Sequence, residues 1–509
     1  MFAKVYSGAM HGMDGYLVEV EVDISNGLPS FDIVGLPDAS VKEARDRVRS
    51  ALKNSGFEFP SRRITVNLAP ADMKKEGPWF DLPIALGILA ATEQVPVEGL
   101  AGLVSLGEMS LDGVVRSVPG VLPMAMAVAK WNSHACLMVP EENAGEGGLV
   151  QGLVVLGVNS LTQVVQYLKE GTGILREQVD VEQMLAPTEK PGLDMCEVRG
   201  QDTAKRAMEI AAAGGHNVLM IGPPGSGKTM LARRLPTILP TMTWEECLEV
   251  SKVYSIAGLL NKNRPLITSR PFRTPHHTAS TASIIGGGRF PRPGEVTLAT
   301  HGVLFMDEFP EYGRDVLEAL RQPLEDRVVT VSRVAAVLTY PADLMLVAAM
   351  NPCLCGHLGD PTRECTCTPL QVQRYRGRIS GPLLDRIDIR VEVPRLEYQE
   401  LEGEPAGESS AEIRCRVEQA RNIQRDRLKG EGITCNAQMH GRQIRRFCTL
   451  ERPAASLLRQ AYNRLGFSMR AHDRILKVAR TIADLEGSDQ ITLQHLGEAL
   501  QYRNSDREQ

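Results

Sequence analysis

Eight consecutive residues, from Gly222 to Thr229 (GPPGSGKT), constrain the fold of this chain more than any other segment. They match the pattern GxxxxGK[ST], in which glycines allow backbone N–H groups to wrap the phosphates of a nucleotide. The apolar run 217–221 comes before the motif, and a helix-like run begins near Lys228. The motif requires this order of strand, turn and helix, because the N-terminus of the helix attracts anionic phosphate. The predicted phosphate-binding residues are Gly222, Pro223, Pro224, Gly225, Ser226, Gly227, Lys228 and Thr229.

A second apolar run, residues 302–306, ends in Asp307 and Glu308. A buried parallel strand delivers side chains to its carboxyl-terminal edge, so both acids are expected beside the phosphate loop. We expect Lys228 to contact the β- and γ-phosphates of ATP. Thr229 and Asp307 would hold Mg²⁺, and Glu308 would orient and deprotonate the attacking water.

Two further polar residues are candidates for the same chemistry. Asn351 follows the apolar run 344–350, and its amide is expected to position water near the γ-phosphate; the alternative is a turn former. Arg386 belongs to the segment SGPLLDRID. An arginine of this kind can cross a subunit boundary and stabilise charge on the γ-phosphate of a neighbour. The alternative is a surface ion pair with Asp385 or Asp388.

Four of the ten cysteines are crowded into one short segment. They are Cys353, Cys355, Cys365 and Cys367. Four thiolates suit tetrahedral zinc, and His357 could replace one of them as a ligand. The alternative is a group of free thiols in a reducing cell.

The net charge of −5, from 57 Lys and Arg against 62 Asp and Glu, excludes nucleic-acid binding through a basic character of the whole protein. A basic groove or pore needs only local positive charge. The candidate DNA-contacting residues are Arg270, Phe272, Arg273, His276 and His277 in a proline-containing loop, and Arg327 and Arg333 in a hairpin-like stretch. The alternative for the loop is internal bracing, with histidines that hydrogen-bond the backbone or lie near the nucleotide. The alternative for the hairpin is a solvated face.

The rest of the chain predicts an α/β protein with several parts, because 509 residues correspond to about three domains. Residues 1–168 alternate strand-like and helix-like runs, which predicts a mixed α/β domain. Residues 169–194 are polar and contain Pro and Gly, as in a linker. Strands alternate with helices in residues 195–394, which predicts a parallel sheet covered on both faces, and residues 395–509 have helical periodicity.

Two local features complete the prediction. Ser40 and Glu43 have the spacing of a capping box at the start of the helix-like run 40–54. The longest apolar run, residues 82–91, is too short to span a bilayer, and the N-terminus lacks the apolar segment of a signal peptide. We therefore expect a cytoplasmic protein with no membrane partner.

Several stretches together resemble AAA+ ATPases of the magnesium chelatase type, and most closely the ComM/YifB family of bacterial proteins. They are FDIVGLPDASVKEARDRVRSAL, GPPGSGKTMLARRLPTILP, RPFRTPHHTAS, HGVLFMDEFPE, AAMNPCLCG, SGPLLDRIDI and SMRAHDRILKVARTIADL. The resemblance covers nearly the whole chain. It implies a ring-forming ATPase, expected as a hexamer, that uses ATP and Mg²⁺. The implied activity is that of a DNA helicase or translocase that binds single-stranded and branched DNA and drives branch migration in homologous recombination, notably during natural transformation. A recombinase is a further expected partner.

The resemblance also implies roles for single residues. Lys228 and Thr229 look like Walker A, Asp307 and Glu308 like Walker B, and Asn351 like sensor 1. Arg386 resembles the arginine finger, and Arg470 resembles sensor 2 in the helical lid, with Arg474 one turn later as the alternative.

The segment DMKKEGPWFDL, residues 72–82, resembles the Lon-protease/ribosomal-S5-like fold. The Lon pattern needs a nucleophilic serine after Gly-Pro, and this chain has Trp79 there. An indole cannot act as that nucleophile, so we expect a scaffold that binds DNA or organises the ring, without peptidase activity.

Two other functions stay open at this point. One is an ATPase subunit that inserts magnesium into a porphyrin, against which the fused N-terminal domain and the cysteine cluster count. The other is a non-enzymatic nucleotide-binding scaffold, against which the complete phosphate loop and acidic pair count.

Overall fold

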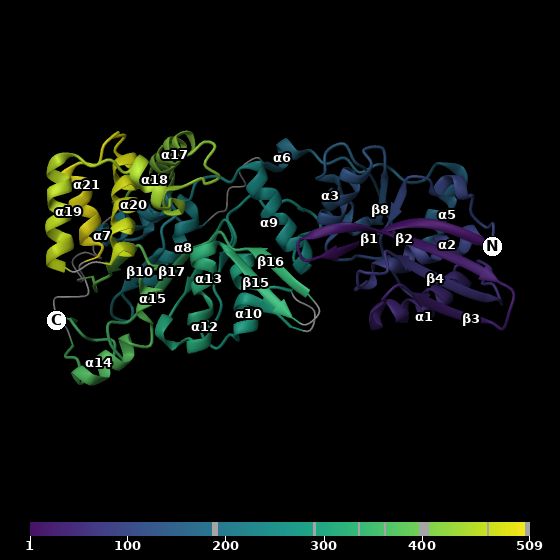
Figure 1. The fold of residues 1–509 in the computed structure, drawn as a ribbon, viewed down its shortest axis with the longest axis horizontal. Coiled ribbons are helices and arrows are strands. Elements are labelled where there is room, and N and C mark those ends of the chain that lie inside the picture. Colours follow the sequence, from purple (N-terminus) through teal and green to yellow (C-terminus); the bar gives the residue numbers. More distant parts are fainter. Residues whose placement is uncertain are drawn as a thin grey trace. The chain divides into compact units, whose positions relative to one another are not determined.

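The computed structural model describes residues 1–185, 192–288, 292–333, 336–360, 363–396, 407–465 and 468–503 (Figure 1). It forms two compact units, one of residues 1–187 with 244–268 and the other of residues 188–243 with 269–509. The sequence-based division treated residues 195–394 as one continuous core. The structure differs, because segment 244–268 folds with the first unit.

A seven-stranded mixed sheet forms the centre of the first unit, in the order β3-β4-β2-β1-β5-β8-β9. The strands are β1 (Phe2–His11), β2 (Asp14–Ser25), β3 (Ser30–Val34), β4 (Arg63–Ala69), β5 (Leu103–Ser105), β8 (Cys136–Pro140) and β9 (Val154–Val158). Burial alternates along β2, where Val18, Val20 and Val22 face the core, as expected for a strand with one buried face. The helices of residues 1–187 are α1 (Ala39–Asn54), α2 (Asp81–Ala91), α3 (Val121–Trp131), α4 (Glu141–Gly148), α5 (Leu161–Glu170) and α6 (Val181–Leu185). The short ladder β6 (Glu108–Met109) with β7 (Val115–Arg116) and the single turns Pro78–Phe80 and Val97–Leu100 complete this part of the chain.

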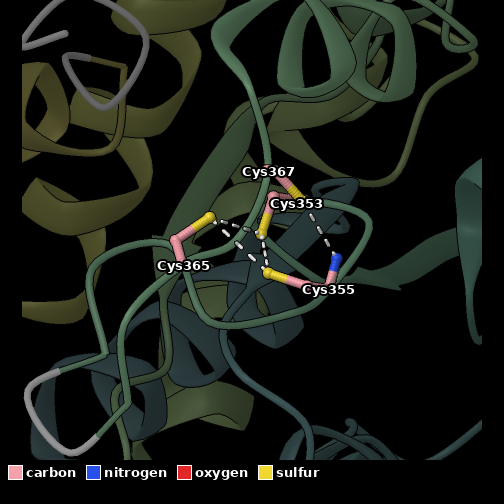
Figure 2. A group of neighbouring side chains, drawn as sticks. All are labelled: Cys353, Cys355, Cys365 and Cys367. Carbon is pink, nitrogen blue, oxygen red and sulfur yellow. Dashed lines mark hydrogen bonds between the residues drawn. The ribbon is translucent and has the colours of Figure 1, made fainter.

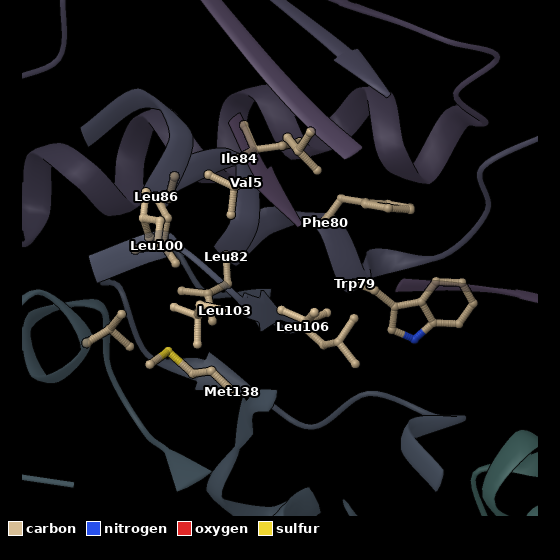
Figure 3. Packing of buried hydrophobic residues seen from close by; sticks show 14 of the residues in the cluster. Val5, Trp79, Phe80, Leu82, Ile84, Leu86, Leu100, Leu103, Leu106 and Met138 are labelled. Atoms are coloured by element: carbon tan, nitrogen blue, oxygen red, sulfur yellow. The ribbon is translucent and has the colours of Figure 1, made fainter. Parts of the chain in front are cut away.

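Helix α2 is buried along its whole length, which explains its continuous apolar sequence (Figure 3). Gly87 allows it to lie against the sheet, since a Cβ there would be 2.5 Å from Val22 Cγ2. Arg47 on α1 donates two hydrogen bonds to Asp81 at the start of the helix, at 2.6 and 2.9 Å. Burial raises the pKa of Asp81, and the Arg47 guanidinium opposes that shift.

Trp79 lies beside this core and has a structural role. Only 8% of it is exposed, and its indole Nε1 donates to the Pro119 carbonyl at 2.9 Å. The indole ring of Trp79 is therefore packed and hydrogen-bonded (Figure 3). The Lon-protease/ribosomal-S5-like fold of this domain and its lack of peptidase activity stay predictions.

The predicted capping box at Ser40 and Glu43 is wrong. Helix α1 begins at Ala39, and its N-cap is Asp38, whose Oδ1 accepts from the Val41 N–H at 2.8 Å. Asp caps a helix as well as Ser does, and Asp38 caps this helix two residues before the predicted cap Ser40.

Helix α9 (Trp244–Ala257) belongs to the first unit, although it follows the phosphate-loop helix in the sequence. It packs on α3, and its Ser255 hydroxyl donates to the buried carboxylate of Glu146 on α4. Glu146 also accepts from the Leu122 N–H at 2.8 Å and from the Asn143 amide at 3.1 Å. Burial raises the pKa of Glu146, and these donors oppose that shift. One carboxylate thus joins α9 to α3 and α4.

The second unit contains a five-stranded parallel sheet in the order β11-β14-β17-β10-β18. The strands are β10 (Val218–Ile221), β11 (Phe272–Arg273), β14 (Val303–Met306), β17 (Met345–Met350) and β18 (Ile389–Glu392). Two small ladders, β12 (Gly286–Gly287) with β13 (Arg292–Pro293) and β15 (Val328–Arg333) with β16 (Ala336–Pro341), lie outside this sheet. The α/β class and the parallel core predicted from the sequence are confirmed.

Helices complete the second unit, and its last part is helical as predicted (Figure 1). Those between the strands are α7 (Asp202–Gly214), α8 (Lys228–Ile238), α10 (Thr281–Ile285), α11 (Glu295–Leu298), α12 (Arg314–Ala319), α13 (Arg321–Asp326), α14 (Pro369–Arg376) and α15 (Gly381–Leu384). The later ones are α17 (Ser410–Arg427), α18 (Gly441–Phe447), α19 (Arg452–Leu465), α20 (Met469–Leu485) and α21 (Leu493–Gln501). Single turns at Met195–Glu197, Phe309–Glu311 and Asn436–Gln438 link them. Helices α17 and α20 both pack on α7, so the C-terminal helices share the core of the sheet.

Among the described residues, the helices are all too short or too polar to cross a lipid bilayer.

We predict that Glu146→Ala loosens α9 within the first unit. The substitution leaves the Leu122 N–H and the Ser255 hydroxyl buried without an acceptor, at a cost of about 2–4 kcal/mol. Hydrogen exchange followed by mass spectrometry should show faster exchange in α9 and α3. Glu141→Ala, at an exposed position of the same helix, should exchange like the wild type. Equal exchange in both variants would contradict the anchoring role of Glu146.

Candidate nucleotide site and arginine cluster

The phosphate loop follows β10 and is closed by glycines at positions that other residues could not occupy. A Cβ on Gly222 would lie 2.1 Å from the Val393 carbonyl oxygen, so only glycine fits there. Gly225 and Gly227 have φ angles of +78° and +93°, in the left-handed region. Gly227 is the N-cap of α8, so the loop ends at the positive end of that helix.

The ammonium group of Lys228 lies inside this loop. Its Nζ donates to the carbonyls of Gly222 and Pro223 at 2.7 and 2.8 Å. The Asn351 Oδ1 atom is 3.4 Å from the same nitrogen. Burial lowers the pKa of Lys228, and the charge of Asp307 opposes that shift. The structure therefore brings together the lysine and the amide that the sequence assigned to one site.

Thr229 and Asp307 form the predicted pair of magnesium ligands. The Thr229 hydroxyl donates to Asp307 Oδ2 at 2.7 Å. The other carboxylate oxygen accepts from the backbone N–H of Glu308 at 2.9 Å. A hydroxyl and a carboxylate at the edge of a parallel sheet are oxygen ligands of the kind that Mg²⁺ prefers. Both side chains would offer only oxygen atoms to a Mg²⁺ ion.

Glu308 has an unusual backbone conformation, with φ +50° and ψ +44°. This left-handed conformation is costly for a residue with a side chain, and such residues are enriched at functional sites. Its carboxylate lies 3.3 Å from His277 Nδ1, and the side chain is 57% exposed. The acid predicted as the base is thus accessible and is contacted by one histidine.

His277 is held in place by Tyr312. The two rings meet edge to face with centroids 6.5 Å apart, and the Tyr312 hydroxyl donates to the Pro275 carbonyl at 2.6 Å. Burial, together with the charges of Asp307 and Glu308, raises the pKa of Tyr312, so it stays a neutral donor. The sequence contained no signal for Tyr312, because its partner lies far away along the chain.

The residues before His277 brace the sheet. Arg270 donates to the carbonyls of Pro240 and His301 at 2.6 and 2.7 Å. Phe272 stacks on Phe305 at 6.0 Å, and Arg273 forms a two-bond ion pair with Glu295 at 2.6 and 2.8 Å. These contacts fit the bracing alternative, with a histidine near the nucleotide. DNA contact by this loop, including His276, stays a prediction.

The hairpin formed by β15 and β16 contains the two other candidates for DNA contact. Arg327 precedes it and forms an ion pair with Asp343. Arg333 ends β15, and its side chain lies outside the described part of the structure. A role of this hairpin at DNA therefore stays a prediction too.

Arg386 and Arg470 lie near the amino ends of the parallel strands, whereas the phosphate loop lies at their carboxyl ends. Strands β10 and β18 run parallel, with Val218 opposite Ile389. The phosphate loop follows the carboxyl end of β10, whereas Arg386 comes before the start of β18. The four residues of β10, at about 3.3 Å each, separate the two groups. Arg386 and Arg470 line a cavity of about 160 Å³ whose lining contains no residue of the phosphate loop.

One acid, Glu325 on α13, connects these two arginines. It forms an ion pair with Arg386, and its other oxygen is 3.8 Å from Arg470. Arg386 is only 7% exposed. Burial, and then the positive charges of Arg321, Arg470 and Arg474, lower its pKa. Nothing in the sequence singled out Glu325, because α13 reaches the cluster only through the fold.

Arg474, the alternative to Arg470, has a different partner. It donates to Asp388 at 2.6 Å, and His216 lies 3.4 Å from the same carboxylate. Burial alone would raise the pKa of Asp388, but Arg474 and His216 hold it well below its usual value. Asp388 Oδ2 also accepts from the Asn217 N–H, directly before β10. Arg474 thus holds the start of β10 through Asp388. Arg470, by contrast, has a side chain that is 60% exposed.

The four cysteines converge (Figure 2). The four sulfur atoms of Cys353, Cys355, Cys365 and Cys367 lie within 4.8 Å of one another. Cys353 is fully buried, and the other three are half-buried. His357, the substitute ligand considered from the sequence, has its Nδ1 3.2 Å from Asp360.

Three family models match the chain in succession. Residues 194–401 match the model described as magnesium chelatase, subunit ChlI. Residues 20–143 match subunit ChlI of Mg-chelatase, and residues 407–503 match the C-terminal part of that subunit.

Similarity to individual proteins extends over nearly the full chain. The competence protein ComM of Haemophilus influenzae is 47% identical over 505 residues, which are 98% of this chain and 97% of that protein. The YifB protein of Salmonella typhimurium is 45% identical over 507 residues, 99% of this chain and 97% of that protein. The YifB protein of Escherichia coli is 45% identical over 505 residues, with the same two coverages.

We predict that His277→Asn lowers the turnover of ATP about tenfold and leaves its KM unchanged. The histidine contacts the exposed carboxylate of the predicted base and the rings of His276 and Tyr312, and its loss affects the orientation of that base. His276→Asn is the matched control, because the His276 ring bonds to Thr278. Steady-state ATP hydrolysis without DNA would measure both variants. An equal loss in the two variants would point to folding of the loop instead.

Proposed function

Because this chain belongs to the ComM/YifB family of magnesium chelatase-type AAA+ proteins, we propose that it is a ring-forming motor that hydrolyses ATP to drive branch migration of DNA. The observation that carries the proposal is the division of the site. The phosphate loop and acidic pair lie at one edge of the sheet, and Arg386 and Arg470 lie at the other.

Hydrolysis would use the residues at the phosphate-loop edge. Lys228 would exchange its two carbonyl partners for β- and γ-phosphate oxygens, which are stronger acceptors because they are charged. Thr229 and Asp307 would hold Mg²⁺. Glu308 would take the proton of the attacking water, with Asn351 positioning that water. ATP and Mg²⁺ are the cofactors of this chemistry, and a structural Zn²⁺ would belong to the four-cysteine cluster.

The arginines would act on a neighbouring copy. Neither Arg386 nor Arg470 faces the phosphate loop of its own chain. A head-to-tail contact between copies would bring one edge of the sheet to the other, and such contacts close into rings. Arg386 would then exchange Glu325 for a γ-phosphate, with Arg470 beside it. This supports the arginine-finger role of Arg386. Arg470 would act as sensor 2 toward the nucleotide of the adjacent subunit, with a hexamer as the expected ring.

Branched DNA is proposed as the substrate. The relative with the highest identity among those described is named a competence protein, and it covers the full chain. DNA would pass along loops such as the β15–β16 hairpin. A local positive charge is enough to attract DNA there, although the net charge of the whole chain is −5. A motor on DNA with a reduced cysteine cluster belongs in the cytoplasm. A recombinase would supply the joined duplexes.

Insertion of magnesium into a porphyrin is the competing proposal, since the matching models are described by that subunit. One experiment separates the two. ATP hydrolysis is measured with and without four-way DNA junctions, and the DNA products are resolved on a gel. Stimulation by junctions with strand-exchange products supports the motor. A protein that hydrolyses ATP at one rate in both samples and leaves the junctions intact would refute it.

We predict that Lys228→Ala and Glu308→Gln fail at different steps. Loss of the Lys228 ammonium removes the charge that faces the phosphates, so nucleotide binding should weaken at least about tenfold. Glu308→Gln keeps that charge and should bind ATP normally, with turnover lowered about 100-fold or more. Fluorescent-nucleotide titration and single-turnover hydrolysis distinguish the steps. Wild-type turnover in Glu308→Gln would exclude this residue as the base.

We predict that Arg386→Ala and Arg470→Ala each abolish most hydrolysis in a uniform ring but can be rescued in mixed rings. A subunit with an intact phosphate loop regains activity when its neighbour supplies both arginines. Mixing Arg386→Ala with Lys228→Ala should therefore restore part of the turnover that each variant lacks. Arg445→Ala, on the exposed face of α18, is the control and should hydrolyse ATP normally. Absence of rescue would mean that the arginines act within their own chain.

A further inference from the structure

The four-cysteine cluster is arranged as a metal site. Cys353 Sγ is 3.3 Å from Cys355 Sγ and 3.6 Å from Cys365 Sγ, and the last two sulfur atoms are 3.5 Å apart (Figure 2). All four cysteines are free of disulfides. Thiolates at about 2.3 Å from a tetrahedral zinc ion are about 3.8 Å apart, whereas bonded sulfurs are about 2.05 Å apart. The observed spacing is therefore near that of a zinc tetrahedron.

A backbone hydrogen bond supports the same interpretation. The N–H of Cys355 donates to Cys367 Sγ at 3.3 Å (Figure 2). Such donors orient metal-bound thiolates and offset their charge. The two Cys-x-Cys pairs thus come together from separate segments, and one backbone N–H, that of Cys355, already points at a sulfur atom, that of Cys367. We propose that Cys353, Cys355, Cys365 and Cys367 bind one Zn²⁺, and that the metal holds the segment after Asn351 against the phosphate loop.

Contacts on both sides of the cluster link it to the nucleotide site. Cys353 follows Asn351 by two residues, and Asn351 is the amide beside Lys228. Gly356 has a φ of +84°, and a Cβ there would lie 2.8 Å from Pro224 Cδ in the phosphate loop. The backbone of the cysteine loop therefore packs directly on the loop that would hold the phosphates.

Helix α14 supports the other side. It begins directly after Cys367, with Thr368 as its N-cap in a capping box with Gln371. Arg376 at its end donates to the Pro352 carbonyl at 3.2 Å, between Asn351 and Cys353. A metal that joins the two Cys-x-Cys pairs would tie α14, the sensor segment and the phosphate loop into one structure. This coupling rests on the proposed ATP site, whereas zinc binding does not.

The first test is the metal content of the full chain, purified in reductant without added metal. We expect about one zinc per chain by plasma mass spectrometry, and release of that zinc as the four thiols are titrated with a mercurial. Replacement by Co²⁺ should give the intense visible absorption of a tetrahedral tetrathiolate site. Cys353→Ser and Cys365→Ser should lose the metal. Cys415→Ser, at an exposed cysteine of α17, should keep it.

The wild-type measurements keep this test decisive if the serine variants do not fold. Iron in place of zinc, or a wild-type protein that takes up neither zinc nor Co²⁺ while its four thiols react at once, would overturn the assignment. Zinc retained in Cys353→Ser with one ion per chain would remove Cys353 from the site.

The second test is the coupling between metal and nucleotide. Linked sites must affect each other by the same factor, and typical couplings are about 5-fold or more. We expect an ATP analogue to tighten zinc binding, measured as the zinc captured by 4-(2-pyridylazo)resorcinol at equilibrium, and zinc removal to weaken analogue binding, with both affinities changing by that factor. Lys228→Ala should show zinc binding without protection. Equal zinc release with and without bound analogue would refute the coupling, and failure of the analogue to bind the wild type would instead refute the proposed ATP site.

Discussion

The second unit depends on the pairing of β10 with a parallel strand on each side. Val218–Ile221 pairs with β17 on one edge and with β18 on the other. The Gly222 N–H continues the first ladder to Met350, and the Val393 N–H continues the second to Ile221. This register places Asn351 beside the phosphate loop at the carboxyl end. It also places Asp388 and its arginine cluster at the amino end, so one four-residue strand separates two chemical groups.

Burial of charge explains how each group keeps its arrangement. A buried ammonium or guanidinium is costly unless polar groups surround it. Lys228 is surrounded by loop carbonyls, and Arg386 by Glu325 and the Pro382 carbonyl. For Lys228 a charged phosphate oxygen is a stronger partner than the neutral carbonyls present, whereas for Arg386 it would replace one anion, Glu325, by another. In the proposed ring, Lys228 of one copy and Arg386 of its neighbour would bind the same nucleotide.

The arrangement of the motifs proposed to bind phosphate could be predicted from the sequence because these motifs are local. The strand, the glycine turn and the helix of the phosphate loop are consecutive, and the acids of Asp307 and Glu308 end an apolar run. The pairing of Thr229 with Asp307 followed from the rule that parallel strands end at one edge. Contacts between distant elements could not be predicted in this way. Tyr312 beside His277, and Glu325 between two arginines, are brought together only by packing. The same limit applies to the start of α1, because the choice of Asp38 as its N-cap, in place of the predicted Ser40, shows only in the backbone geometry of the structure.

After α8 the chain enters the first unit, where it forms α9, and it returns to the second unit before β11. The chain therefore passes from one unit to the other three times. The helix packs on α3 of the first unit, and its side chains Cys247, Val250 and Val253 are buried. Removal of residues 1–187 would leave this apolar face exposed to solvent, where it would favour aggregation. A truncation after residue 187 therefore does not separate the two units, because residues 244–268 of the first unit lie between two segments of the second.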